Sequence, residues 1–194
     1  MSVVRQRRNN VCLLCMSISA LLLCCNGASI QQKLDIMQAV PVNLDLDHME
    51  CWQNDSLLDS RPWEDTPLKL CVYVSPENCT SCYLKKMFQW DDFIEMEKVG
   101  KFYIFFIFTP QDGCEDDFHR FFYQVRLNHP FYLDKRKEFL TKNPQIPKET
   151  MFHIFLIDED NNIILVGDVL HNISVEERLR EILDEYEKSH RGEK

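Results

Sequence analysis

The chain has 194 residues, of which 45% are hydrophobic and 27% are charged, a composition typical of a folded domain and not of a disordered segment. The formal net charge is −9, which argues against a nucleic-acid-binding protein, because such proteins gather Lys and Arg on one surface. The length is enough for one domain with a hydrophobic core plus an extension, and protein or small-molecule partners stay open.

Residues 1–25 have the layout of a secretory signal. Three arginines in "MSVVRQRRNN" precede the apolar run "VCLLCMSISALLLCC", which is shorter than the about 20 apolar residues of a membrane span. The run ends in cysteines, as in a bacterial lipoprotein signal, and Cys25 is the better candidate for lipidation. The alternative is ordinary cleavage near Gly27 or Ala28. We favour the lipoprotein, which would face the periplasm from the cell envelope; ordinary cleavage would give a soluble periplasmic or secreted protein.

Export places the cysteines in an oxidising compartment, where thiols pair or carry out chemistry. Five of the nine cysteines follow the signal, at positions 51, 71, 79, 82 and 114. Because this number is odd, at least one thiol is free or pairs outside the chain.

Residues 26–65 are predicted to form a tether and an N-terminal extension, rich in acids, prolines and turn formers. Within it, "VNLDL" alternates apolar and polar residues and is a candidate short strand.

From residue 66 the pattern alternates strands with helices. "LKLCVYVS" and "KFYIFFIF" are apolar, β-rich runs typical of strands buried on both faces. Helical spacing runs between them from about Cys79 to Met96, and a second helix is predicted after residue 110. "HPFYLD" is a short strand candidate and "KRKEFLTKN" a short helix.

The C-terminal part is predicted to be a hairpin followed by a helix. "MFHIFLIDEDNNIILVGD" reads as two strands around a polar turn, and "SVEERLREILDEYEKSH" as an amphipathic helix with Ser174 as its N-cap. The fold class is therefore α/β, with three layers, a central mixed sheet, a C-terminal antiparallel hairpin and a closing helix.

This order resembles the thioredoxin fold: a buried strand, the CxxC of "SPENCTSCYLKKM" at a helix start, a βαβ unit, the hairpin "FLIDEDNNIILVGD" and a last helix. The closest resemblance is to the envelope thiol-disulfide oxidoreductases of the TlpA/ResA type, including thioredoxin-like lipoproteins of Bacteroidetes. It implies a thioredoxin-like domain over residues 66–190.

The chain departs from this family at two places. The family usually has an aromatic residue just before the first cysteine, where this chain has Asn78. The family also has a cis-proline immediately before the strand that enters the hairpin. Here that position falls on Phe152 or a neighbour in "TMFHI", and Pro147 lies several residues too early.

The CxxC offers chemistry because a thiolate is the nucleophile of disulfide exchange, and a helix start favours the thiolate. Cys79 would attack and Cys82 would resolve the mixed disulfide. Asn78, Met151 and Phe152 would line the substrate groove. The family commonly has a buried acid beneath the resolving cysteine, but "LKLCVYVS" contains none, and Glu77 is expected on a loop.

Other cysteines and histidines have less specific interpretations. Cys114 follows the longest strand and could be a third redox cysteine, could pair with Cys51 or Cys71, or could be an isolated buried thiol. Cys71 is expected to be a small core residue, and His153 a satisfied core or rim residue. No metal site is expected, because zinc needs four ligands and only one CxxC pair is present.

Two functions follow from these features. The first is thiol-disulfide exchange on exported protein thiols or disulfides, without a bound cofactor, with a membrane redox partner and an N-terminal lipid anchor. The second is a noncatalytic thioredoxin-fold lipoprotein that acts as a binding or assembly module, with Cys79 and Cys82 as a structural disulfide.

Overall fold

The computed structural model describes residues 29–54, 56–59, 66–78, 80–99, 102–113 and 128–190. Three positions of interest, Cys25, Cys79 and Cys114, lie outside these ranges, as does most of the helix predicted after residue 110. No helix in the described ranges combines the length and the apolar character that crossing a membrane requires.

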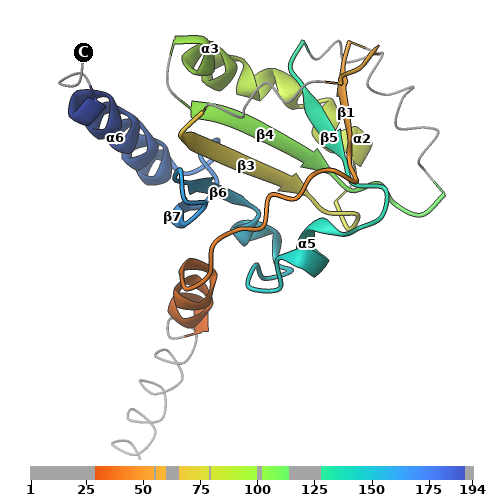
Figure 1. Ribbon diagram of the computed structural model, residues 1–194, viewed down its shortest axis with the longest axis horizontal. Coiled ribbons are helices and arrows are strands. Elements are labelled where there is room, and N and C mark those ends of the chain that lie inside the picture. Colours follow the sequence, from red (N-terminus) through yellow and green to blue (C-terminus); the bar gives the residue numbers. More distant parts are fainter. Residues whose placement is uncertain are drawn as a thin grey trace, which may run out of the picture.

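A seven-stranded mixed sheet organises the described residues, in the order β2-β1-β5-β4-β3-β6-β7. Its members are β1 (Glu50–Gln53), β2 (Ser56–Leu57), β3 (Leu68–Val74), β4 (Phe102–Phe108), β5 (Phe131–Leu133), β6 (Ile154–Ile157) and β7 (Ile163–Val166). The central strands β3, β4 and β5 are parallel, whereas β6 and β7 form an antiparallel hairpin beside β3. The predicted mixed sheet with its C-terminal hairpin is confirmed (Figure 1).

The two central strands are buried on both faces, as their sequences predict. All seven residues of β3 and all seven of β4 are buried. Successive side chains of a strand point to opposite faces, so alternate residues enter two separate cores. Leu70, Val72 and Phe106 belong to one core, and Cys71 and Phe105 to the other.

Helices cover both faces of the sheet, which gives the predicted three layers (Figure 1). The first core is covered by α2 (Thr80–Leu84), the 3₁₀ helix η1 (Met87–Trp90), α3 (Asp91–Val99) and the closing helix α6 (Ile173–His190). The second is covered by α5 (Phe139–Lys142), the 3₁₀ helix η2 (Thr150–Phe152) and a helix over residues 29–38. The thioredoxin-like arrangement of strands and closing helix expected from the sequence is thus present.

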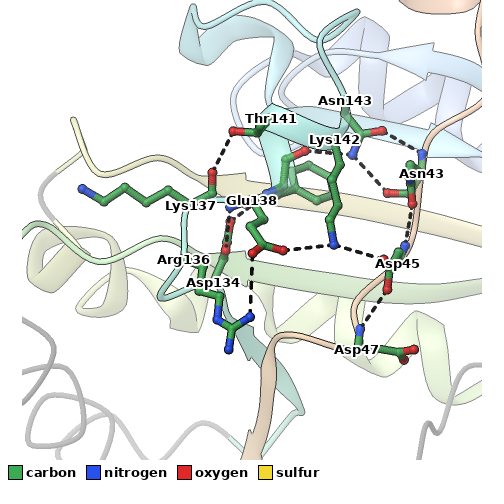
Figure 2. A network of polar contacts seen from close by, with 11 residues as sticks. Asn43, Asp45, Asp47, Asp134, Arg136, Lys137, Glu138, Thr141, Lys142 and Asn143 are labelled. Carbon is green, nitrogen blue, oxygen red and sulfur yellow. Dashed lines mark hydrogen bonds and ion pairs between the residues drawn. The ribbon is translucent and has the colours of Figure 1, made fainter.

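The segment from residue 29 to residue 46 is packed against the second core. Met37, Val42 and Leu46 are buried there. The Asn143 side chain holds the segment from both sides, accepting from the backbone N–H of Asn43 at 2.7 Å and donating to its carbonyl at 3.0 Å (Figure 2). The strand predicted for "VNLDL" is wrong: residues 41–46 have no regular secondary structure and pair with no strand among the described residues.

The helix predicted to run from Cys79 to Met96 is interrupted. A turn at Lys85 and Lys86 separates α2 from η1, and α3 then begins at Asp91. A 3₁₀ helix places residues i and i+3 on the same side, so η1 directs both Met87 and Trp90 into the core, where each is 1% exposed.

The N-cap predicted for the last helix is also wrong. Asn172, not Ser174, caps α6: its side-chain oxygen accepts from the backbone N–H groups of Ser174 at 3.1 Å and Val175 at 3.4 Å. Asparagine caps helices as well as serine does, and the two candidates are only two residues apart.

Candidate functional site

The dithiol segment follows the carboxyl end of the central strand β3. Residues 75–78 turn away from the sheet, and the Asn78 N–H donates to the Ser75 carbonyl at 3.0 Å. The helix α2 begins at Thr80, directly after Cys79, and carries Cys82 with an exposed side chain. The CxxC segment therefore sits at the edge of the sheet where parallel strands place their carboxyl ends, the edge at which ligands bind in open α/β sheets.

A cleft of about 710 Å³ opens beside this segment. It brings together four residues predicted from the sequence: Asn78, Cys82, Met151 and Phe152. They meet because β6 runs antiparallel to β3, with Val72 opposite Ile154, so the residues before β6 lie next to those after β3. The remaining walls come from the helix over residues 29–38, the end of β3, α2 and its following turn, η2, β6, the end of the hairpin and the start of α6. They include Ile30, Leu34, Tyr73, Tyr83, Lys86, Thr150, His153, Ile154, Val166, Gly167, Asp168, Asn172 and Val175.

The helix over residues 29–38 forms one wall of this cleft. Lys33 makes an ion pair with Glu149 and lies over the Phe152 ring, with its ammonium 5.9 Å from the ring centroid. Ile30, 43% exposed, and Met151, 55% exposed, leave apolar surface beside the opening. The cleft thus offers apolar walls with few charges, a surface suited to part of a protein chain.

His153 occupies the position immediately before β6, and its side chain is 2% exposed. Its Nε2 lies 3.0 Å from the Pro147 carbonyl oxygen, and its ring meets Tyr73 edge-on at a centroid distance of 5.0 Å. Burial lowers the pKa of this imidazole, partly opposed by the Pro147 carbonyl and by the carboxylates of Glu77 and Glu149. The place where the family has a cis-proline is therefore filled by a neutral histidine, and the described residues contain no cis peptide bond.

A buried polar chain lies below the cleft, on the second face of the sheet. The Thr109 hydroxyl donates to the Tyr73 phenol at 3.0 Å and lies 3.5 Å from the Asp134 carboxylate. Burial raises the pKa of Tyr73, with a smaller contribution from the Asp134 charge, so the phenol keeps its proton. The carboxylate of Asp134 also accepts from the backbone N–H groups of Glu138 and Phe139, each at 2.9 Å, which fixes the start of α5 (Figure 2).

The remaining described cysteines lie in the core. Cys71 is fully buried in β3 and Cys51 is 8% exposed in β1; both are free thiols. Burial raises the pKa of both thiols, so neither is a ready nucleophile. The core role predicted for Cys71 is confirmed, and the described residues lend no support to pairing of Cys51 or Cys71 with Cys114.

Two residues of the cleft escaped the sequence analysis. His153 was expected to be a satisfied core or rim residue; it is buried, but its Nδ1 has no hydrogen-bond partner in the described ranges. Tyr73 was assigned only to a strand. The signal that could have found both is their position, since each lies at the strand end that faces the CxxC. Among the described residues, no group of three or more His, Cys, Asp or Glu side chains could hold a metal ion.

No protein-family model matches the chain, and no curated protein matches it significantly. Similar solved structures include a candidate protein disulfide isomerase from Bacteroides thetaiotaomicron, with 17% identity and a TM-score of 0.48 over 73% of this chain and 89% of that one. A candidate thiol:disulfide interchange protein DsbE from Chlorobium tepidum has 14% identity and a TM-score of 0.44 over 62% and 81%. The thioredoxin domain of a thiol-disulfide oxidoreductase from Bacteroides vulgatus has 17% identity and a TM-score of 0.42 over 69% and 93%. Because all three TM-scores lie below 0.5, the fold assignment rests on the strand order and directions described above.

Proposed function

We propose that this protein carries out thiol-disulfide exchange on exported proteins through Cys79 and Cys82. The observation that supports it best is the position of Cys82, exposed in α2 and lining a cleft of about 710 Å³ with apolar walls. A dithiol that served only as a staple would need no cleft. A disulfide that closes so short a loop would also remove little entropy from the unfolded chain, so it would stabilise the fold less than a disulfide that closes a longer loop.

In this proposal Cys79 attacks a substrate disulfide as a thiolate and forms a mixed disulfide with one substrate sulfur. Cys82 then attacks Cys79, which releases the reduced substrate and leaves the enzyme oxidised. Asn78, Met151 and Phe152 form the groove that receives the substrate segment. Cys114 would be a third redox cysteine. A membrane dithiol or disulfide partner would return the pair to its starting state.

The N-terminal segment supports a place in the cell envelope, with the domain facing the periplasm. Three arginines and an apolar run precede Cys25, the proposed lipid attachment site, and the packed helix begins only a few residues later. Metabolic labelling with a fatty-acid analogue tests this directly. The wild-type chain should be labelled and a Cys25→Ser chain should not, whereas equal labelling of the two would exclude Cys25 as the anchor.

A second candidate is a noncatalytic binding or assembly module with a structural Cys79–Cys82 disulfide. It is favoured by the residues before β6, where Phe152 and His153 stand in place of the family's proline. In that protein the cleft would bind a partner without exchanging electrons with it.

Exchange with a quenched fluorescent peptide disulfide separates the two candidates. The wild-type chain should reduce the peptide, Cys79→Ser should abolish the reaction, and Cys82→Ser should trap the peptide on Cys79. Cys51→Ala is a matched control, because Cys51 is a described thiol away from the cleft. Peptide that binds to the wild-type chain but is never reduced would support the binding module.

A further inference from the structure

The helix over residues 29–38 is held against the domain along its length and beyond its end. Met37 on its inner side is fully buried, and Lys33 makes an ion pair with Glu149 in front of η2. The chain that follows the helix is tied to the domain by two hydrogen bonds between its backbone and the Asn143 side chain (Figure 2). The helix is therefore part of the folded domain, and it carries one wall of the cleft with it.

This packing limits how far the cleft can lie from Cys25. Residues 26–28 are all that separates Cys25 from the helix, and Ile30 in the first turn of the helix lines the cleft. An extended chain spans at most about 3.6 Å per residue, so Ile30 lies within about 18 Å of Cys25. Leu34, which also lines the cleft, follows about 6 Å along the helix axis. This wall of the cleft therefore lies within about 24 Å of the proposed lipid attachment site.

The surface around this helix carries exposed apolar side chains. Eight large apolar residues are exposed in the described ranges, and half of them lie on the helix, just after it or beside it: Ile30, Ile36, Val40 and Met151. Met151 belongs to this group because it lines the cleft together with Ile30. The first turn of the helix, nearest to the proposed anchor, lies at its end away from the sheet (Figure 1). The domain thus presents apolar side chains at the end that the anchor would hold against a bilayer, whose interface accepts such side chains.

Resting on the proposed function and its lipid anchor, we infer that the cleft works at the bilayer surface and that its substrates are disulfides of membrane-bound proteins. The short connection keeps the cleft and such disulfides in one layer about 24 Å deep, which raises their local concentration. The apolar side chains around the helix contact the bilayer interface. A free tether over residues 26–65 would instead let the domain move up to about 140 Å from the membrane, where soluble substrates would be reached equally well.

The test uses the full-length lipidated chain in vesicles of phosphatidylethanolamine and phosphatidylglycerol. Two quenched fluorescent peptide disulfides are compared, one free in solution and one attached to a lipid headgroup by a spacer of about five residues, which spans at most about 18 Å. A helical spacer of about 40 residues, inserted between Gly27 and Ala28, lifts the domain by about 60 Å. We expect it to slow reduction of the lipid-attached peptide by about 10-fold and to leave reduction of the free peptide unchanged. The same spacer added after Lys194 is the matched control and should change neither rate.

A second measurement does not depend on catalysis. A photo-crosslinking amino acid in place of Ile36 should form adducts with labelled lipid, and the inserted spacer should abolish them. The same amino acid in place of Leu57, which is exposed to a similar extent in β2 at the opposite edge of the sheet from β7, should form few adducts.

Equal adducts at the two positions, or a lipid-attached peptide reduced equally fast with and without the inserted spacer, would overturn the inference. A chain that is not labelled at Cys25 would overturn it together with the proposed anchor. A chain that reduces neither peptide would refute the exchange function and the substrate class, whereas the lipid adducts at Ile36 would still decide where the cleft lies.

Discussion

Replacement of Asp134 by alanine should destabilise the domain because this buried carboxylate organises the start of α5. It is 1% exposed and accepts two backbone N–H groups at 2.9 Å, and the Thr109 hydroxyl lies 3.5 Å away. Loss of a capping side chain costs about 0.5–2 kcal/mol. A buried donor left without a partner costs about 1–3 kcal/mol. Because the Phe139 N–H would be such a donor, we expect a loss of about 3 kcal/mol in the free energy of unfolding.

Urea unfolding followed by circular dichroism measures this loss, and thermal unfolding should show a decrease in Tm of about 6–12 °C for a chain of this size. Asp134→Asn keeps one acceptor oxygen and should lose about 1 kcal/mol, the value of one ordinary hydrogen bond. Asp112→Ala is the matched control: this exposed acid pairs with Lys137 at the surface, and its removal should cost less than about 0.5 kcal/mol. If Asp134→Ala lost no more than Asp112→Ala, the capping role would be refuted.

Three further predictions concern the walls of the cleft. First, because burial lowers the pKa of His153, the unfolded chain gains a proton at this residue as pH falls through about 6.5 while the folded chain does not. His153 should therefore make the urea midpoint fall between pH 7.5 and pH 5.5, and His153→Gln should weaken that dependence; an equal fall in both chains would contradict it. Second, Met37→Ala should cost about 2–5 kcal/mol, because the side chain of Met37, on the helix over residues 29–38, is fully buried. A loss as small as that of Ile36→Ala, an exposed neighbour, would mean that this helix does not pack against the core. Third, Gly167→Ala should cost about 1–3 kcal/mol in thermal unfolding, because φ is +145° and an added Cβ would lie 2.9 Å from Cγ2 of Val175; full stability would show that the hairpin end can relax.

The sequence predicted the centre of the fold because its signals are local. The uninterrupted apolar runs of β3 and β4, the polar turn between β6 and β7 and the apolar stripe of α6 each lie within one short window. Their physical cause is direct: a strand buried on both faces has no polar residues to alternate, and a surface helix has one apolar stripe.

The edges of the sheet were not predictable in this way. Strand β1 is short and pairs with β5, about 80 residues later, so no local pattern specifies it. The alternation in "VNLDL" predicted a short strand; the structure has the alternating burial, with Val42 and Leu46 buried and Asp45 exposed, but not the strand. Its backbone, however, is satisfied by Asn143, 100 residues away, and by Asn161, and not by a neighbouring strand.

The residues of the candidate site could be predicted only where the sequence shows where a strand ends. Asn78, Cys82, Met151 and Phe152 were expected together from the resemblance, and the pairing of β3 with β6 brings them to one cleft. The helix that supplies Ile30 and Leu34 could not be placed there, because its packing depends on the tertiary contacts of Met37 and Lys33. His153 was missed because a histidine in an apolar run reads as core until its hydrogen bonds are known.

The central claim is tested most directly by a redox titration of the Cys79–Cys82 pair, combined with the rate at which Cys79 is alkylated as a function of pH. We expect a reduction potential within the range of exchange proteins, about −120 to −270 mV, and an alkylation midpoint below about 8.5 that is lost in Cys79→Ser. A potential below about −300 mV, typical of a structural disulfide, together with an ordinary thiol pKa, would contradict the exchange function and leave a stapled binding module.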